Sequence, residues 1–107
     1  MRVRKILEIK GTALFTITPD KTLAEGIAIM AEHDVGSLVC FEHGRMVGML
    51  TFRELLNSLH RHGPAAGSLR IAEVMVRNPH IALPDMEIGD LCRMMIEHHM
   101  RYLPVME

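Results

Sequence analysis

The chain repeats itself at a spacing of 65 residues, and this repeat limits its fold more than any other feature of the sequence. The matches at that spacing are Pro19-Asp20 with Pro84-Asp85, Met30 with Met95, Glu32-His33 with Glu97-His98, and Leu38 with Leu103. A short unit that occurs twice cannot bury its apolar face alone, so the two copies are expected to cover each other. The order of apolar runs and turns in the first copy predicts a unit of strand, helix, hairpin and helix.

Local signals place the individual elements. Thr22 with Glu25 has the pattern of a capping box, and Leu23, Ile27 and Met30 follow at helical spacing, so a helix is expected to run to about His33. The other expected elements are a short helix or turn at 3–7 ended by Lys10-Gly11, a strand at 13–17, hairpin strands at 37–41 and 46–50 around the turn 42–45, a helix at 52–59, a linker at 62–68, a strand at 81–83, and a helix opened by Asp85 or Met86.

Composition excludes several classes of function. The 107 residues are 49% hydrophobic, which suits one small domain with a core. Lys and Arg number 12 against 13 Asp and Glu, so no basic excess favours nucleic acid or an anionic membrane. The first ten residues contain no apolar segment typical of a signal peptide or membrane span. Cys40 and Cys92 are far apart and are expected to be free thiols in a reducing compartment, by default the cytoplasm.

The stretch from Gly48 to Glu54 carries the chemistry of a ligand-binding corner. Gly48 allows another backbone or a flat ligand to come close, Thr51 places a hydroxyl where a strand gives way to a helix, and Glu54 adds a carboxylate in the first turn. A purely structural interpretation has equal weight. In it, Thr51 is only a helix N-cap, and Glu54 completes a capping box.

These motifs resemble the CBS domain pair, also called the Bateman module. The segments that carry the resemblance are Pro19-Asp20-Lys21-Thr22-Leu23, Val35-Gly36-Ser37-Leu38-Val39 and Gly48-Met49-Leu50-Thr51 in the first motif, with Asn78-Pro79-His80-Ile81 and Arg101-Tyr102-Leu103-Pro104-Val105 in the second. The resemblance implies an α/β (α+β) fold of tandem motifs, each a small sheet with two helices, related by a pseudo-twofold axis. It places the first motif at 1–62, a linker at 63–70 and the second motif at 71–107.

The second motif departs from the pattern. The counterpart of Gly48 would be position 113, so the last strand and helix of the repeat have no counterpart in this sequence. We therefore expect either a fragment of a longer protein or a strand edge at 103–106 that another chain completes.

The resemblance also implies a ligand site in the cleft between the two motifs. The residues that it assigns to this site are Met49, Leu50, Thr51, Arg53, Glu54, His80, Ile81, Ala82, Met100, Arg101, Tyr102 and Pro104. A second, incomplete site would keep Phe15, Ile17, Val35, Gly36 and Ser37.

The residue types at the first site suit an adenine nucleotide, AMP, ADP or ATP, or a related adenosyl ligand. A purine fits between apolar side chains such as Met49, Ile81 and Met100, while Thr51, a helix N-terminus and an arginine suit phosphate. We expect AMP or ATP rather than S-adenosylmethionine, because Arg53 and Arg101 favour phosphate. The family usually has aspartate where Glu54 stands, and the longer side chain is expected to shift or weaken the ribose contact. In the structural interpretation, Arg101 is a solvated surface residue and Tyr102 only covers the core edge.

The sequence favours neither catalysis nor a metal site. It contains no recognisable nucleophile motif, H-E-x-x-H or P-loop, and the pairs His60 with His62 and His98 with His99 lack the i, i+4 spacing of a zinc helix. We therefore expect no enzyme activity, no metal and no cofactor. The expected function is a regulatory sensor that forms a homodimer and acts on an enzyme or transporter that the sequence does not identify. The alternative is an assembly module that dimerises without any small ligand.

Overall fold

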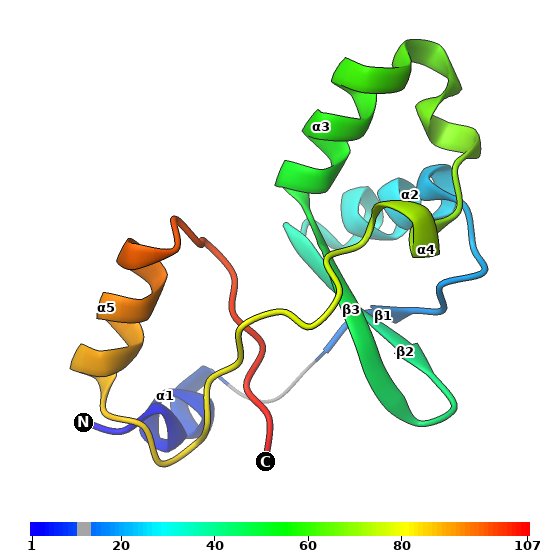
Figure 1. Cartoon of the computed structure of the whole chain (residues 1–107). Coiled ribbons are helices and arrows are strands. Elements are labelled where there is room, and N and C mark those ends of the chain that lie inside the picture. Colours follow the sequence, from blue (N-terminus) through cyan, green and yellow to red (C-terminus); the bar gives the residue numbers. More distant parts are fainter. Residues whose placement is uncertain (11–13) are drawn as a thin grey trace. The chain divides into compact units, whose positions relative to one another are not determined.

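The computed structural model describes residues 1–10 and 14–107, and the chain divides into two compact units (Figure 1). One unit is the continuous segment Leu14–Asn78, and the other combines Met1–Ala13 with Pro79–Glu107. Gly11 and Ala13, which were predicted to end the first helix and to begin a strand, lie outside the described residues.

The unit Leu14–Asn78 is built on a three-stranded sheet with the strand order β1-β2-β3. Strand β1 (Thr16–Ile17) runs parallel to β2 (Ser37–Glu42), which pairs antiparallel with β3 (Arg45–Thr51). His43 and Gly44 form the hairpin turn with φ values of 54° and 76°, as a two-residue turn between twisted strands requires. The predicted hairpin is therefore confirmed, while the first strand is shorter than predicted.

Two capped helices lie in the same unit. Helix α2 (Leu23–His33) begins at Thr22 with the predicted capping box, in which Thr22 N donates to Glu25 Oε2 at 2.9 Å and Glu25 N donates to Thr22 Oγ1 at 3.2 Å. Helix α3 (Phe52–His62) begins at Thr51 and extends three residues beyond the predicted end. Both helices begin where the sequence predicted because each cap depends on residues three positions apart.

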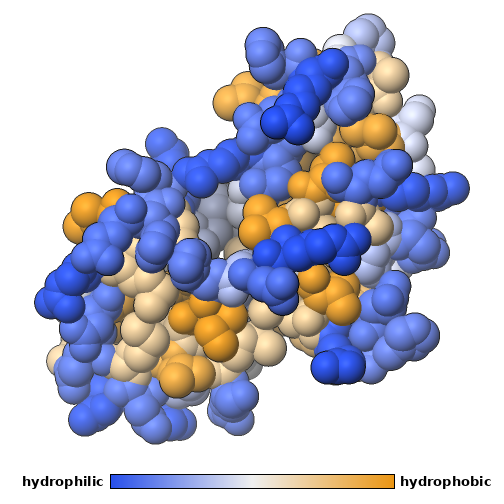
Figure 2. Space-filling view, in the orientation of Figure 1, coloured by the Kyte–Doolittle hydropathy of each residue, from blue (hydrophilic) through white to orange (hydrophobic). Residues whose placement is uncertain are grey.

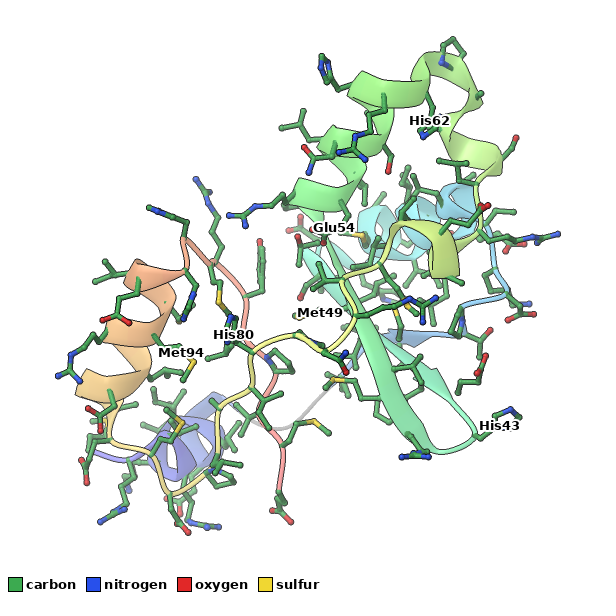
Figure 3. The ribbon with its side chains drawn as sticks, in the orientation of Figure 1. His43, Met49, Glu54, His62, His80 and Met94 are labelled. Carbon is green, nitrogen blue, oxygen red and sulfur yellow. The ribbon has the colours of Figure 1, made fainter. Side chains whose placement is uncertain are left out.

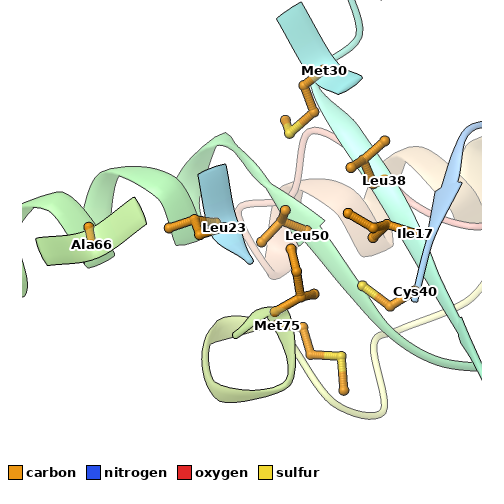
Figure 4. Packing of buried hydrophobic residues seen from close by; sticks show 9 residues of the cluster. Ile17, Leu23, Met30, Leu38, Cys40, Leu50, Ala66 and Met75 are labelled. Atoms are coloured by element: carbon orange, nitrogen blue, oxygen red, sulfur yellow. The ribbon is translucent and has the colours of Figure 1, made fainter. Parts of the chain in front are cut away.

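The core of this unit lies between the sheet and α2 (Figure 4). Its largest fully buried side chains are Leu23, Leu38, Leu50, Ile71 and Cys40. Ile71 belongs to the short helix α4 (Ile71–Val74), which follows the predicted linker in the sequence. The segment after α3 therefore contributes to the core.

The predicted linker between the two motifs is ordered structure. Residues Gly63–Ser68 form a 3-10 helix, η1, with Ala66 only 1% exposed. Leu23 N donates to Leu69 O at 2.8 Å, and Ile71 N donates to Lys21 O at 2.8 Å. Glycine and proline end α3 as expected, and the apolar residues that follow pack against α2. The continuous compact unit ends at Asn78.

The other unit contains α1 (Val3–Lys10) and α5 (Ile88–Glu97). Its first residues pair with the segment before α5, because Val3 N donates to Met86 O at 2.9 Å and Arg4 N donates to Pro84 O at 2.8 Å. Arg4 also contacts Asp85 at 2.8 Å, and this ion pair lowers the pKa of the Asp85 carboxyl. The predicted start of α5 at Asp85 or Met86 is therefore wrong, since residues 84–86 form a turn whose carbonyl groups accept from the first residues of the chain, and the helix begins at Ile88.

The internal repeat has a structural counterpart. Ile17 pairs with Cys40 in parallel within one unit, and Ala82 pairs with Val105 in parallel within the other, with both partners displaced by 65 residues. The predicted strand at 81–83 is reduced to this single bridge. Within the described residues, the second copy has one helix after its strand position, so a sheet with two helices describes the first copy only.

Candidate functional site

The candidate corner is the junction of β3 and α3, where Glu54 is labelled in Figure 3. Glu54 Oε1 accepts two hydrogen bonds from Thr51, one from its backbone N at 2.7 Å and one from its hydroxyl Oγ1 at 2.8 Å. The same hydroxyl accepts a hydrogen bond from Arg53 N at 3.2 Å. The structural role predicted for Thr51 and Glu54 as a capping box is confirmed.

Glu54 is unusual for an acidic residue near a helix start because it is only 8% exposed. Its charge lies near enough to the core to raise the pKa of the Cys40 thiol. Burial, and then the charge of Glu54, raise the pKa of the Cys40 thiol to about 11. Cys40 is thus a protonated, buried thiol, whereas Cys92 is exposed.

Gly48 is needed for the close approach of another backbone. A methyl group on its Cα would lie 2.7 Å from Met75 Sδ and 2.8 Å from the carbonyl oxygen of Val76. The next residue, Met49, exchanges two main-chain hydrogen bonds with Val76, each 2.9 Å long. Of the two uses that the sequence allowed for this glycine, the structure shows the backbone contact.

The other corner residues differ in what they can offer a ligand. Leu50 is fully buried in the core, so its side chain packs against protein. Met49 is 5% exposed, and its main-chain N and O are both bonded to Val76. Arg53 has an exposed side chain one residue before the buried Glu54. The polar groups at the corner are therefore those of Thr51, Arg53 and Glu54.

The second half of the predicted site lies in the other unit. Ala82 N donates to Pro104 O, and Met106 N donates to Ala82 O, both at 2.9 Å, so residues 80–82 lie beside residues 104–106. Ala82 and Pro104 are buried, while the exposed members of this half are His80, Ile81 and Arg101. Met100 and Tyr102 are half-buried.

The five residues of the predicted incomplete site lie together in the unit Leu14–Asn78. Ile17 is in the core, Val35 packs against it, and Ser37 is the register partner of Thr51 across β2 and β3. Gly36 lies just before β2 and is half-buried. The Phe15 ring stacks on the His33 ring with centroids 4.3 Å apart. The residues of the incomplete site thus lie within one unit, the two halves of the main site lie in different units, and the joining of those halves stays a prediction.

Sequence reasoning missed a ring stack that the repeat contains twice. Phe15 with His33 and His80 with His98 are counterparts at the 65-residue spacing, and the two imidazoles of the second pair lie 4.0 Å apart. The match of Glu32-His33 with Glu97-His98 was the available signal. His98 therefore helps to hold His80, a residue of the predicted site.

Two absences concern the described part of the chain only. No group of three or more His, Cys, Asp or Glu residues there could hold a metal ion. No helix there is both long enough and apolar enough to cross a membrane.

The chain was compared with known protein families and sequences. The family model described as CBS domain matches residues 6–61 and 71–107. The CBS domain-containing protein YhcV of Bacillus subtilis is 30% identical over 96 residues, which cover 90% of this chain and 68% of that protein. The chain spans 62% of an uncharacterised 17.7 kDa protein of Acidianus ambivalens and 59% of the methylated protein MJ0556 of Methanocaldococcus jannaschii.

Solved structures show the same fold. The CBS-domain containing protein ATU1752 of Agrobacterium tumefaciens has a TM-score of 0.95 at 24% identity, covering 99% of this chain and 80% of that one. The CBS domain pair of protein MJ0100, crystallised with 5′-methylthioadenosine and S-adenosylmethionine, has a TM-score of 0.85 at 23% identity over 100% and 81%. CBSX2 in complex with AMP has a TM-score of 0.73 at 20% identity over 88% and 73%.

Proposed function

The chain belongs to the CBS domain family, and on this premise we propose that it is a regulatory module that binds an adenosine-containing ligand. The candidate ligands are AMP, ADP, ATP and adenosyl compounds such as S-adenosylmethionine. Two structural relatives bind ligands of this class, AMP in one and S-adenosylmethionine with 5′-methylthioadenosine in the other. The proposal assigns no chemical step to this chain. A ligand would act by shifting a conformational or oligomeric equilibrium that a partner protein reads.

The observation that carries the proposal is the nearly buried carboxylate of Glu54. It is fixed at the end of β3 by two hydrogen bonds from Thr51, beside the exposed Arg53. A ribose presents two adjacent hydroxyl groups, and a carboxylate accepts from both. The other residues proposed for the ligand are His80, Ile81, Met100, Arg101 and Tyr102, next to the buried Ala82 and Pro104. We also propose a reducing compartment such as the cytoplasm, because both cysteines are free.

The proposal predicts that adenosine-containing ligands stabilise the chain against unfolding. A ligand at about 100 times its Kd should add about 2.7 kcal/mol to the free energy of unfolding, which a thermal-shift series with adenosine, AMP, ATP and S-adenosylmethionine would measure. Thr51→Val should weaken binding about 3- to 10-fold in calorimetry, because it removes the hydroxyl that orients Glu54.

Thr22→Val is the matched control for this substitution. It removes the same kind of cap from α2, so both variants should lose about 1 kcal/mol of stability, but Thr22→Val should leave ligand affinity unchanged. Equal losses of affinity in the two variants would mean that Thr51 acts only through stability. Failure of every ligand to bind would leave the assembly function as the better proposal.

A specific observation favours this second function, assembly of two copies through α3. The helix buries polar residues, Glu54 and Ser58, while an apolar row at helical spacing faces outward. Phe52 is 54% exposed, Leu56 is 68% exposed and Leu59 is 54% exposed. Figure 2 shows hydrophobic side chains at the surface among hydrophilic ones where α3 lies. A second copy related by a twofold axis would cover this row with its own.

Leu56→Glu is therefore expected to turn a homodimer into a monomer, since it would place a charge in the centre of the apolar row. Sedimentation velocity would measure the change as a halving of the mass. Ile96→Glu is the control, because Ile96 is 74% exposed on α5 and lies outside this row. A wild-type chain that is monomeric at high concentration would argue against assembly through α3.

A further inference from the structure

We infer that the corner at Thr51 selects adenosine-containing ligands without a phosphate there, because the carboxylate of Glu54 already occupies the place of an anion at the start of α3. This inference rests on the function proposed above and narrows its ligand class. It favours adenosine, 5′-methylthioadenosine or S-adenosylmethionine over AMP and ATP. The sequence, with its two arginines, led us to expect that AMP or ATP binds more tightly than S-adenosylmethionine, and the inference reverses this order of affinity.

Three hydrogen-bond donors that could hold a phosphate at this corner already have acceptors within the protein. The Thr51 hydroxyl has one hydrogen, which it donates to Glu54 Oε1 at 2.8 Å. The backbone N of Thr51 donates to the same oxygen at 2.7 Å, and Arg53 N donates to Thr51 Oγ1 at 3.2 Å. A phosphate could bind the two donors of Thr51 only by displacing Glu54, and it could bind Arg53 N only by displacing the Thr51 hydroxyl.

The charge at the corner also opposes a phosphate. Glu54 accepts two hydrogen bonds at one oxygen, and it is only 8% exposed. Its negative charge already complements the positive end of the α3 dipole. A second anion at the same place would be repelled through a region of low dielectric, where water screens charges poorly.

The first helix of the repeat shows that this arrangement is not a general property of capping boxes. Around Thr22, the hydroxyl accepts from Glu25 N at 3.2 Å, and Glu25 is exposed to water. Around Thr51, the hydroxyl instead donates to Glu54, and the carboxylate is buried. Only the second arrangement fixes a negative charge inside the protein surface.

The two arginines do not offset the repulsion between Glu54 and a phosphate. Arg53 and Arg101 are both exposed, and water screens exposed guanidinium groups more strongly than it screens a buried carboxylate. Glu54 retains acceptor capacity, because a carboxylate offers about four lone-pair sites and two are in use here. Hydroxyl groups of a ribose, or a positively charged sulfonium close to it, suit that capacity better than phosphate oxygens do.

The test measures the Kd of adenosine and the Kd of AMP for the same variant by calorimetry. Both ligands contain the same nucleoside, so the ratio of the two Kd values reports the contribution of the phosphate alone. In the wild-type chain, AMP should bind no more tightly than adenosine. Glu54→Gln keeps the cap but removes the charge, so the ratio of the adenosine Kd to the AMP Kd should rise about tenfold. Glu25→Gln changes the matched capping box of α2 and should leave the ratio unchanged.

The outcomes separate this inference from the proposed function. AMP binding at least tenfold more tightly than adenosine in the wild type would overturn the inference and keep the adenosine-binding function. An unchanged ratio in Glu54→Gln would also overturn it. If none of adenosine, AMP, ATP and S-adenosylmethionine binds the wild type or Glu54→Gln, the proposed function fails, and the inference fails with it.

Discussion

Gly48→Ala is expected to lower the free energy of unfolding of the unit Leu14–Asn78 by about 1–3 kcal/mol. The added methyl group would lie 2.8 Å from the carbonyl oxygen of Val76, which is backbone and cannot rotate away. Relief of this clash requires residues 75–76 to move away from β3, which breaks the paired hydrogen bonds between Met49 and Val76.

Urea denaturation would measure the loss in Gly48→Ala. Gly67→Ala is the control in the same unit, because its methyl group would meet only the Ala24 side chain at an ordinary contact distance of 3.5 Å. Equal stability of the two variants would show that residues 75–76 are not held against β3.

Leu50→Ala is expected to cost about 2–5 kcal/mol, the range for a large side chain removed from a packed core. Leu50 was predicted from the family resemblance to line the ligand site, but its side chain is fully buried beside Ile17, Leu38 and Ile71. The substitution should therefore act on stability. At temperatures where the variant remains folded, ligand affinity should change little.

The two cysteines provide a direct readout of the effect of Leu50→Ala. Cys92 is exposed and should react at once with a thiol reagent, while Cys40 is buried with a raised pKa of about 11 and should react only when its unit opens. Leu50→Ala should accelerate the labelling of Cys40 and leave that of Cys92 unchanged. Leu14→Ala removes the same side chain from a position that is 58% exposed, so labelling of Cys40 should then remain as in the wild type.

The sequence predicted those parts of the fold that depend on neighbouring residues. The capping boxes at Thr22 and Thr51 involve partners three positions away, and the hairpin depends on the two residues of its turn. The repeat also predicted that the second copy would share local structure with the first, and the parallel pairing of Ile17 with Cys40 has its counterpart at Ala82 and Val105. Patterns of this kind are visible in one sequence because the interacting residues lie at fixed spacings.

The remaining features depend on partners that are distant in the sequence. The start of α5 is delayed because residues 84–86 pair with the first residues of the chain. The linker is ordered because Ala66 and Ile71 reach the core, and composition alone does not show this. For the candidate site, the sequence identified Thr51, Glu54 and their capping box, but only the structure shows that Glu54 is buried and that the Thr51 hydroxyl donates to it.

The way in which the two units share the chain also sets an order for folding. Residues 14–78 form one unit without interruption, whereas Arg4 meets Asp85 across 81 positions of sequence. During synthesis, the continuous unit can fold once residue 78 has emerged, while the N-terminal helix must wait for residues 84–88. Closing so long a loop is costly in entropy for a flexible chain. Prior folding of residues 14–78 fixes the separation of their two ends, so the discontinuous unit is expected to form last and to depend on the one that interrupts it.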